Sequence, residues 1–382
     1  MSQYDIIIIG AGPAGSSAAL TLQNSDKRIA LFDKETFPRE KICGDGICDR
    51  SINTLNSISP DYYTEFINHF TPHPIQKTSL VYKGKHHILN FKNFGYTCKR
   101  KDFDAFLFNL VKRDCSHIDI YEKTSVSHIK RTDNTGLTIT TNNGESYSAR
   151  MVIIANGAKS KLAAELQNKS WEKSSNGVAV RAYFSGVRDV QDDMIELHYK
   201  KEFFPGYFWI FPIEKNMYNV GFGYHLKQAD KHLFSIQDIF HSWIETDPQL
   251  KKRFEHATME SKLQGGLIPY NSNNFDCAGD NYIITGDAAS LIDPISGGGI
   301  GSAMYSGHIA AHTAETCIKT QDCSYTTTQN YESQLKARIQ QEIKTRHRLQ
   351  KVISHIPFAL DICAALAKKQ TVLDRISSWY LR

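Results

Sequence analysis

The distribution of apolar residues predicts the first structural elements of the chain. Tyr4 to Ile9 contains four consecutive isoleucines, as expected for a parallel strand that is buried on both faces. Small and apolar residues then recur at helical spacing from Ala14 to Leu22. A second apolar run covers Arg28 to Phe32 and ends at Asp33. A strand, a helix and a second strand in this order predict a doubly wound α/β fold.

The pattern changes in the middle of the chain. Gly136 to Tyr147 predicts a hairpin around the turn sequence Asn142-Asn143-Gly144, and Met151 to Ala155 predicts a short buried strand. From about Val178 to Gly223, β-branched and aromatic residues are interrupted by turn signals. This composition predicts an antiparallel sheet.

The last third of the chain is mostly helical. A short buried strand is predicted at Tyr282 to Thr285, and from Ile300 onward the pattern is helical to the end. A parallel-sheet domain that is interrupted by an antiparallel one and followed by a helical tail accounts for this order.

The composition is that of a folded chain without a membrane span. Of the 382 residues, 41% are hydrophobic and 22% are charged, which suits a sizeable core and, at about 150 residues per domain, two or three domains. No apolar run reaches the roughly 18 residues of a transmembrane helix, and the start, MSQYDIIIIG, lacks the basic leader of a signal peptide. We therefore expect a cytoplasmic protein whose eight cysteines are reduced thiols.

The positive charge is concentrated in the C-terminal tail. Residues 331–382 contain ten Lys or Arg and four Asp or Glu, a net +6, whereas the whole chain carries +5, so nucleic-acid binding is not expected. Residues 336–351 are basic, residues 352–366 are mostly apolar with a break at Pro357, and Lys368-Lys369 follows. Such a tail is typical of peripheral contact with the inner face of a membrane, or of helices packed on the protein with a solvated basic face.

A glycine-rich turn follows the first predicted strand. Gly10-Ala11-Gly12-Pro13-Ala14-Gly15 matches the G-x-G-x-x-G pattern of dinucleotide-binding sites, and it lies between a strand and a helix. Gly10 permits the tight turn, Gly12 a close approach of the pyrophosphate, and Gly15 close packing of the helix. Asp33 lies 18 residues beyond Gly15, where a carboxylate accepts a hydrogen bond from a ribose. Free N–H groups at the start of the helix then bind the phosphates.

A second glycine cluster indicates FAD rather than NAD. Ile284 to Ala289 reads ITGDAA, and Asp293 to Gly301 reads DPISGGGIG. Here the chain resembles the FAD-containing oxidoreductases related to para-hydroxybenzoate hydroxylase. The resemblance implies that Asp287 contacts the ribityl–phosphate chain. It also implies that the helix after Gly299 directs its N-terminus at the isoalloxazine, where it stabilises the negative charge of the reduced flavin.

Two further positions enter through the same resemblance. Arg100 matches an arginine on the phosphate side of the cofactor. Hydroxylases of this group usually have an Asp-Gly pair after the middle strand, whereas this chain has Asn156-Gly157. The charge is therefore missing, which argues against direct, hydroxylase-style handling of NADPH.

Two longer segments resemble the geranylgeranyl reductase family. Pro38 to Gly46, PREKICGDG, is similar to the family's P-x-x-K-x-C-G-x-G loop, although Asp45 replaces a glycine that is common there. Tyr207 to Pro212, YFWIFP, followed by Gly221-Phe222-Gly223, is similar to the family's Y-x-W-x-F-P…G-x-G substrate motif. The resemblance covers residues 1–310.

This resemblance implies the architecture. We expect an α/β fold in which a Rossmann-like FAD-binding domain is interrupted by an antiparallel β-sheet substrate domain and followed by a C-terminal helical tail. The expected ranges are 1–75, 96–170 and 270–330 for the FAD-binding domain, 76–95 and 171–269 for the substrate domain, and 331–382 for the tail.

The motifs also imply the residues of the site. The expected cofactor-binding residues are Gly10, Gly12, Pro13, Ala14, Gly15, Asp33, Lys34, Arg100, Gly157, Gly286, Asp287, Pro294, Gly298, Gly299 and Ile300. The expected substrate-binding residues are Tyr207, Trp209, Phe211, Pro212, Gly221 and Gly223. The expected catalytic residues are Lys41, Cys43 and Gly44. No metal site is expected.

The residue types agree with these roles. Tyr207, Trp209 and Phe211 alternate along one strand, so they share a face that either lines an apolar slot or forms an ordinary aromatic core. Gly221 and Gly223 remove side chains where another group must come close. The Cys43 thiol, with an ordinary pKa of about 8.5, is a candidate proton donor; the alternative is a packing role.

The resemblance implies an FAD-dependent oxidoreductase. The expected reaction is reduction of carbon–carbon double bonds in an apolar isoprenoid or lipid-like substrate, with hydride from flavin N5 and a proton from Cys43 or water. The electron donor is NAD(P)H or a reduced carrier protein, because no second dinucleotide motif is present. Two alternatives are an FAD-dependent monooxygenase or halogenase acting on an aromatic or polyketide-like compound, and a flavin-binding electron-transfer protein.

Overall fold

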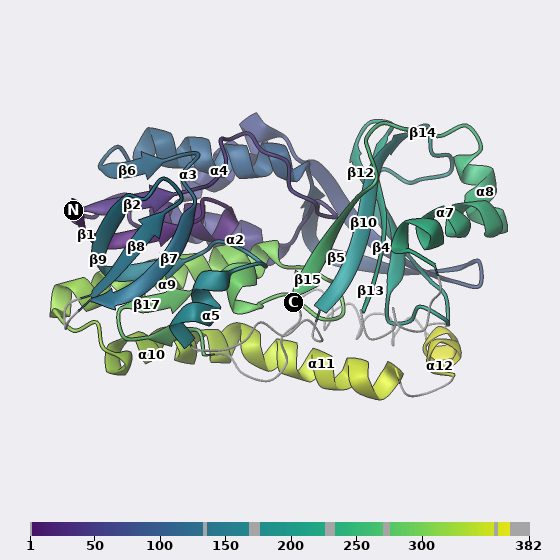
Figure 1. Cartoon of the computed structure of the whole chain (residues 1–382). Helices are drawn as coiled ribbons and strands as arrows, with labels where there is room; N and C mark the ends of the chain where they lie inside the picture. Colours follow the sequence, from purple (N-terminus) through teal and green to yellow (C-terminus); the bar gives the residue numbers. More distant parts are fainter. Residues whose placement is uncertain are drawn as a thin grey trace.

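Two β-sheets organise the molecule, and helices cover them on the outside (Figure 1). The computed structural model describes residues 2–132, 136–167, 176–225, 234–269, 276–354 and 358–366. Pro357, Lys368 and Lys369 of the predicted tail lie outside the described residues.

The first sheet contains the parallel strands that the isoleucine-rich start predicts. In spatial order these are β17 (Tyr282–Ile284), β9 (Ser146–Ile154), β1 (Ser2–Ile9), β2 (Ile29–Phe32) and β6 (Ile118–Tyr121). The antiparallel strands beside them are β16 (Ala278–Gly279), β7 (Val126–Thr132) and β8 (Gly136–Thr141). The predicted hairpin is confirmed as the β8–β9 pair, and the strand predicted at Met151 is the second half of the longer β9.

Helices pack closely on this first sheet. They are α1 (Pro13–Thr21), α2 (Asp49–Ile58), α3 (Pro60–Glu65), the π-helical η1 (Phe66–Phe70), α4 (Arg100–Asp114), α5 (Lys161–Gln167), the 3-10 helix η3 (Gly286–Ala289) and α9 (Ile300–Thr320). Helices α1 and α9 touch through small residues, since a Cβ atom added at Gly307 would lie 2.0 Å from the carbonyl oxygen of Ala14. The starts of both helices are thereby held at the same end of the sheet.

The second sheet is mixed rather than wholly antiparallel. Its strands, in spatial order, are β14 (Thr258–Met259), β10 (Asn176–Ser185), β13 (Met217–His225), β12 (Tyr207–Glu214), β11 (Met194–Tyr199), β4 (His73–Tyr82), β5 (Lys85–Thr97) and β3 (Gly46–Ile47), with β15 (Gln264–Pro269) also paired to β10. The pairs among β10, β13, β12 and β11 are antiparallel as predicted, but β11 pairs with β4 in parallel. The expected antiparallel arrangement was therefore wrong for this pair, which joins segments far apart in the sequence.

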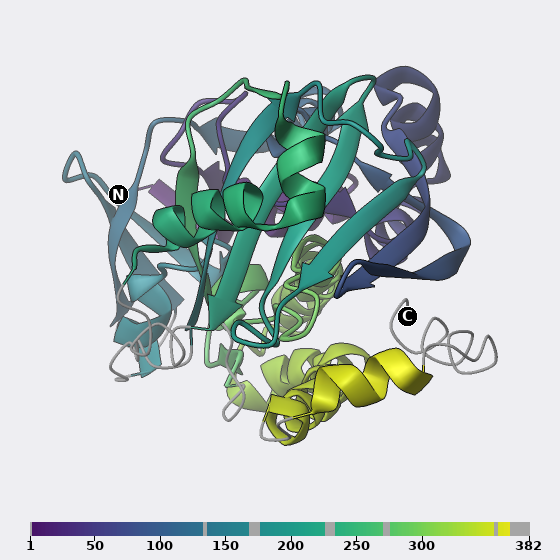
Figure 2. The same ribbon diagram turned by 90° about the vertical axis from the view of Figure 1, so that its right-hand side faces the viewer.

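The two faces of the second sheet differ. Helices α7 (Ile236–Thr246) and α8 (Pro248–Phe254) cover its outer face (Figure 2), where Phe208, Phe222 and Trp243 are buried. The opposite face is turned towards the first sheet and carries the alternate residues of the same strands. The predicted aromatic row lies on this inner face.

The tail is helical over its described residues, as predicted. It contains α10 (Tyr325–Leu335), the π-helical η4 (Lys336–Gln340), α11 (Gln341–Ser354) and α12 (Ala359–Leu366). Helix α10 lies below the first sheet in the view of Figure 1, and α11 continues from it below the second sheet. Arg346 on this helix forms an ion pair with Asp293, and Gln350 donates to the carbonyl of Pro294 at 2.7 Å. Among the described helices, none has the length and apolarity that crossing a membrane requires.

A buried ion pair joins the second sheet to α8. Glu196 on β11 is 1% exposed, and its two oxygens accept hydrogen bonds from Arg253 at 2.7 Å each. One of them also lies 2.9 Å from Nε2 of His198. Burial alone would raise the pKa of Glu196, but the hydrogen bonds from His198 and Arg253 bring it to about 2. Because the folded pKa is depressed, the stabilisation is complete above the usual Glu pKa of about 4.3 and is lost as the pH falls towards 2.

We expect Glu196→Gln to lower the free energy of unfolding at pH 7 by about 3 kcal/mol, because it leaves the Arg253 guanidinium buried without its carboxylate. The acid-dependent loss of stability should also be smaller in the variant. Denaturant unfolding at a series of pH values measures both effects. The control is Glu214→Gln, whose ion pair with Lys99 is more exposed and should change stability by less than about 0.5 kcal/mol. Equal stability of Glu196→Gln and the wild type would contradict this account.

Candidate active site

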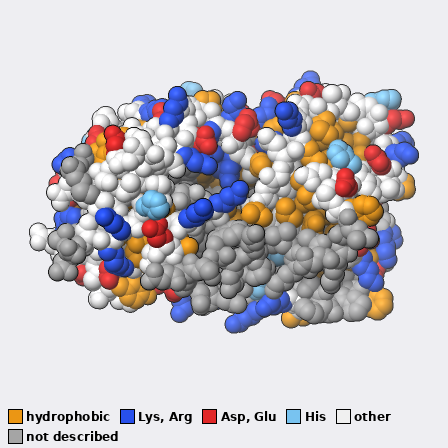
Figure 3. All heavy atoms as spheres, in the orientation of Figure 1, with side chains coloured by type: hydrophobic (Ala, Val, Ile, Leu, Met, Phe, Trp, Pro, Cys, Tyr) orange, Lys and Arg blue, Asp and Glu red, His pale blue; other side chains and the backbone are white. Residues whose placement is uncertain are grey.

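A large cavity lies between the two sheets. Its volume is about 1650 Å³, beyond the roughly 300–1,000 Å³ of a typical site for one small ligand. Its walls come from the glycine turn at 10–14, the loop 39–46, the segment 292–303 and the inner face of the second sheet. Lys and Arg side chains gather around the hollow on the face shown in Figure 3. The cavity therefore has room for a cofactor and a second molecule side by side.

The glycine turn offers an open cradle to this cavity. Gly12 is the N-cap of α1, without a side-chain cap and without an acidic residue in the first turn. A Cβ atom at Gly12 would meet only Nη2 of Arg39, at 3.3 Å, whereas one at Gly15 would lie 1.7 Å from the carbonyl oxygen of Gly10. Gly10 itself has a φ of +102°. The turn thus needs Gly10 and Gly15 to form, while Gly12 leaves space and first-turn N–H groups for a pyrophosphate.

The predicted ribose acceptor lies beside this turn. The carboxylate of Asp33 accepts hydrogen bonds from the backbone N–H groups of Ala11 at 2.6 Å and Glu35 at 2.9 Å. Asp33 lines the cavity and also fixes the shape of the turn. The side chain of its neighbour Lys34 is 70% exposed at the rim of the cavity.

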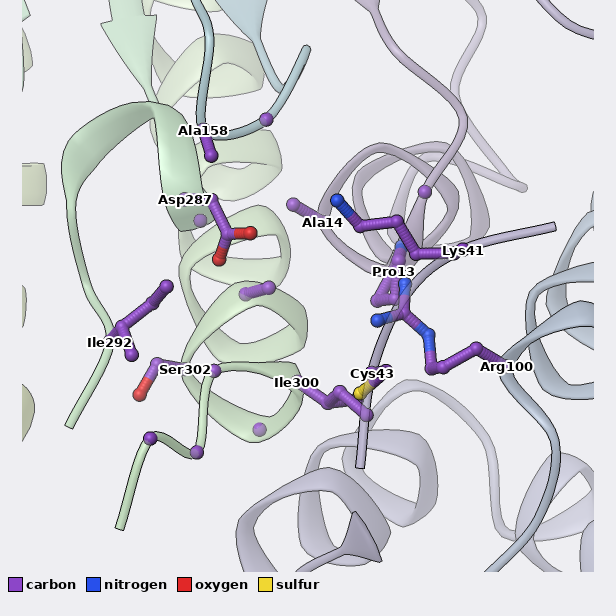
Figure 4. Close-up of a pocket in the computed structure, with 18 of the residues that line it drawn as sticks. Pro13, Ala14, Lys41, Cys43, Arg100, Ala158, Asp287, Ile292, Ile300 and Ser302 are labelled. Atoms are coloured by element: carbon purple, nitrogen blue, oxygen red, sulfur yellow. The ribbon is translucent and has the colours of Figure 1, made fainter. Parts of the chain in front are cut away.

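The second glycine cluster faces the first across the cavity. Asp287 on η3 directs its carboxylate into the space towards Lys41 and Ala14 (Figure 4). Gly299, the N-cap of α9, has no side-chain cap, and the first turn of α9 contains no acidic residue. A Cβ atom at Gly299 would lie 3.2 Å from an oxygen of Asp287. Two uncapped helix starts therefore face one cavity, an arrangement that fits the negative charges of a flavin dinucleotide.

The remaining predicted cofactor residues divide into two groups. Those that line the cavity are Pro13, Ala14, Gly157, Gly286, Gly298 and Ile300. Pro294 lies behind the wall, where its carbonyl accepts a hydrogen bond from Gln350. The Asn156-Gly157 pair is part of the wall, and Gly157 has a φ of +82° with open space where a Cβ atom would lie.

Arg39, Arg100 and Asp104 form a charged cluster beside the glycine turn. Arg100 on α4 donates twice to Asp104, at 2.8 Å each, and Arg39 lies 3.2 Å from the same carboxylate. The guanidinium of Arg100 extends towards Pro13 and Cys43 (Figure 4). Because two cations share one carboxylate, a positive charge remains beside the phosphate cradle. Sequence reasoning missed Arg39, although it belongs to the same loop motif as Lys41.

The loop 41–46 places two titratable groups in the cavity. Burial raises the pKa of the Cys43 thiol, and the charge of Arg100 opposes this only in part, so the thiol is protonated at neutral pH. Burial lowers the pKa of Lys41; the negative charge of Asp287 opposes the shift and the positive charge of Arg100 adds to it. Gly44 lies against Phe211, since a Cβ atom there would be 3.4 Å from the ring.

Asp45 anchors this loop to the second sheet. It has a φ of +67°, in the left-handed region that favours glycine, which explains the glycine common at this position of the motif. Its side chain accepts hydrogen bonds from the backbone of Arg100 at 3.1 Å, from Tyr183 at 2.7 Å and from Asn219 at 2.7 Å. Burial raises the pKa of Asp45, and the bonds from Tyr183 and Asn219 oppose the shift. Aspartate tolerates this conformation, and its hydrogen bonds hold the loop.

The aromatic row on β12 forms the far wall. Tyr207, Trp209 and Phe211 all line the cavity, as predicted from their alternation. The indole Nε1 of Trp209 donates to Asn219 at 2.9 Å, and Asn219 in turn donates to the carbonyl of Cys43 at 2.8 Å. The row is thus tied to the loop that carries the candidate proton donor.

Three predicted substrate residues lie outside the cavity wall. A Cβ atom at Gly221 would be 2.1 Å from the ring of Trp209, so the close approach predicted for this glycine is made by the indole. At Gly223 the neighbour is Ala179, at 3.1 Å. Pro212 accepts a hydrogen bond from Thr97 through its carbonyl. These residues shape the wall from behind, and their direct contact with a substrate stays a prediction.

Comparisons with known proteins agree with this geometry. A family model described as pyridine nucleotide-disulphide oxidoreductase matches residues 4–176, and a model described as geranylgeranyl reductase catalytic domain matches residues 177–263. A digeranylgeranylglycerophospholipid reductase of Methanococcus vannielii is 28% identical over 361 residues, which cover 91% of this chain and 87% of the relative. A menaquinone reductase of Mycobacterium tuberculosis is 25% identical over 324 residues, which cover 82% and 76%.

Solved structures share the fold. A geranylgeranyl bacteriochlorophyll reductase-like protein from Thermoplasma acidophilum superposes with a TM-score of 0.85 at 24% identity, covering 100% of this chain and 97% of that one. A flavin-dependent brominase has a TM-score of 0.76 at 20% identity, covering 99% and 94%. A reductase-like protein and a brominase therefore share this fold with the chain. The match of the catalytic-domain model and the named relatives show that the chain is similar to proteins of the geranylgeranyl reductase family.

Proposed function

We propose that this protein reduces carbon–carbon double bonds in the isoprenoid chain of a lipid-like substrate. The observation that carries the proposal is the continuity of one cavity, which runs from the glycine turn past Cys43 to the aromatic row. The residues expected to bind FAD and the apolar wall therefore line the same cavity. The names of the relatives, a digeranylgeranylglycerophospholipid reductase and a menaquinone reductase, support a substrate with an isoprenoid chain.

The part of the cavity on the second sheet suits an apolar chain. Beyond Trp209 it is lined by Ile75, Phe91, Ile195 and Leu197 from β4, β5 and β11. These side chains offer hydrocarbon surface along the sheet, and an isoprenoid gains free energy by leaving water for it.

The residues beside the flavin site supply the other half of the reaction. A bound, reduced flavin supplies a hydride equivalent to one carbon of the double bond, so the neighbouring carbon requires a proton. Cys43 can donate it, because its thiol is protonated and lies on the loop between the glycine turn and the aromatic row. Trp209, held in place by its hydrogen bond to Asn219, lines the cavity, where its ring would shield the reacting atoms from water. Lys41, which lines the cavity with Asp287, would place its amino group beside the anionic reduced cofactor.

The electron donor is part of the proposal. We propose that the donor is NAD(P)H or a reduced carrier protein. FAD would occupy the glycine turn, so NAD(P)H would have to bind elsewhere, and the missing charge at Asn156 argues against hydroxylase-style handling of NADPH. The monooxygenase or halogenase alternative has the shared fold in its favour, but the matched catalytic-domain model favours the reductase.

We expect Cys43→Ala to slow the reoxidation of anaerobically reduced enzyme by a polyprenyl substrate by about 10²- to 10⁴-fold, because the proton donor is lost. In the wild type, the rate constant should fall as the pH rises through the raised thiol pKa, above the usual value of about 8.5. The variant, which lacks the thiol, should not show this fall of the rate constant at high pH. Single-turnover absorbance measurements from pH 6 to 10, with mass analysis of products two hydrogens heavier, test both points.

The matched control for this test is Cys48→Ser, a change at an exposed thiol five residues further on, which should keep the rate within about twofold. A Cys43→Ala enzyme with the wild-type rate and pH profile would assign the proton to another donor. If the reduced wild type is not reoxidised by any polyprenyl alkene, the proposed function itself is wrong.

Gly12→Leu should give a folded but colourless protein. Its side chain would enter the open cradle where only Arg39 lies within 4 Å, so the fold is spared and the pyrophosphate is excluded. Gly15→Ala is the contrasting variant, because its Cβ atom would overlap the carbonyl of Gly10 and should destabilise the protein by more than about 3 kcal/mol. Flavin absorbance per chain and thermal unfolding of the apoproteins provide the measurements. A yellow Gly12→Leu protein would place the cofactor elsewhere.

We also propose that the tail contacts an anionic membrane surface peripherally. Helix α11 buries Ile343 and Gln350 against the rest of the protein, which fits the packed alternative for that face, while Val352 is 59% exposed. Phe358 and Ile362 nearby are 62% and 50% exposed. Apolar side chains among basic residues favour the surface of a membrane from which a lipid-like substrate would come.

Val352→Glu with Ile362→Glu should weaken cosedimentation with anionic vesicles about tenfold or more, because both apolar contact and charge attraction are lost. Met259→Glu changes an apolar residue of similar exposure, 39%, far from the tail and serves as the control. Equal binding of all three proteins would overturn this proposal.

A further inference from the structure

Arg181 is a buried cation without a hydrogen-bond partner. It lies on β10 and is 2% exposed, and both its Nε and Nη2 atoms are buried without a partner. The nearest carboxylate oxygen, on Glu40, is 3.8 Å from Nη2, beyond hydrogen-bond distance, and the Glu40 side chain is 59% exposed. The ring of Tyr183 lies 4.4 Å from the guanidinium carbon.

The other buried arginines of the described chain are neutralised. Arg100 is paired with Asp104, Arg253 with Glu196 and Arg346 with Asp293. Removing a guanidinium from water carries a large desolvation penalty unless an anion and hydrogen bonds replace the water. Arg181 lacks such hydrogen bonds, and the negative charge of the buried Asp45, whose pKa Arg181 helps to lower, acts on it without a hydrogen bond between them. Buried donors of this kind point to a site that a ligand completes.

The surroundings of Arg181 belong to the substrate half of the cavity. Arg181 lines the cavity and pairs in register with Gly221 on β13 and with Gln264 on β15. It therefore shares the inner face of the sheet with Trp209, which lies opposite Gly221. The phosphate cradle for the dinucleotide is on the other sheet, at Gly12.

The acidic groups near Arg181 do not satisfy it. The carboxylate of Asp45 is directed at Arg100, Tyr183 and Asn219, from which it accepts three hydrogen bonds. Glu40 is the other carboxylate, and its exposure makes it a weak partner. The guanidinium thus keeps donors for an incoming anion, and its planar fork matches the oxygens of a phosphate.

We propose that Arg181 binds the phosphate head group of the isoprenoid substrate and so selects an anionic lipid over a neutral one. The inference rests on the proposed function and refines its substrate class: the chain would lie along the apolar wall, with the phosphate at Arg181. Neutral isoprenoids, such as a quinone, would leave the guanidinium uncompensated. A phosphate on a single isoprenoid chain and one in a glycerophospholipid offer the same chemistry.

The test measures binding without turnover. Oxidised, FAD-bound protein is titrated calorimetrically in one detergent with phytanyl phosphate, diphytanylglycerol phosphate and phytanol. All three have saturated chains, so none can be reduced, and failure of the reductase reaction would leave the result intact. We expect the wild type to prefer the phosphate ligands over phytanol by about tenfold or more. The stronger of the two phosphate ligands identifies the source of the head group.

Arg181→Met should abolish this preference while phytanol binding stays within about twofold, because only the charge recognition is removed. Arg181→Lys should retain part of it, because the charge remains without the planar fork. Met fills similar space, so the variant should fold, although the melting temperature should fall modestly because Asp45 loses the nearby positive charge.

Three binding results would overturn the proposal. They are an unchanged preference in Arg181→Met, wild-type binding that does not distinguish phytanyl phosphate from phytanol, and binding of inorganic phosphate as tight as that of phytanyl phosphate. Loss of FAD from Arg181→Met would equally count against it, because the arginine would then serve the cofactor. The wild-type comparison remains decisive even if a variant fails to fold.

Discussion

The arrangement of the site depends on the buried carboxylate of Asp45. The loop that carries Cys43 leaves the first sheet and must be held against the second, and the bonds from Tyr183 and Asn219 do this. Asn219 extends the contact to Trp209, so the thiol and the aromatic row are positioned by one connected set of hydrogen bonds. In a low-dielectric interior such a set is strong when complete, because each unpaired member would be costly.

The strand, glycine turn and helix of the predicted FAD-binding segment could be predicted because each is encoded by residues that are close in the sequence. A buried parallel strand, a turn that requires Gly10 and Gly15, and a helix start are all encoded within the first 21 residues. The aromatic row could also be predicted, since alternation along one strand fixes a common face whatever the strand pairs with. In each case the physical cause lies between neighbours in the sequence.

Features that arise from long-range pairing could not be predicted. Arg181 looks like an ordinary polar position in a strand, and its burial follows only from pairing with β13 and β15. The parallel contact of β11 with β4 joins segments more than a hundred residues apart. A close approach at Gly221 is predictable from the sequence, but the partner strand decides that the approaching group is the ring of Trp209.

The tail helix α11 joins the C-terminal part of the chain to the segment before α9. Its buried face contacts Asp293 and Pro294 in the loop before α9, while its other face carries exposed apolar side chains. The same helix thus carries exposed apolar side chains and the residues that hold the segment before α9. A change to the buried face of this helix would therefore reach the segment before α9 through two direct contacts, although the two elements are about fifty residues apart in the sequence.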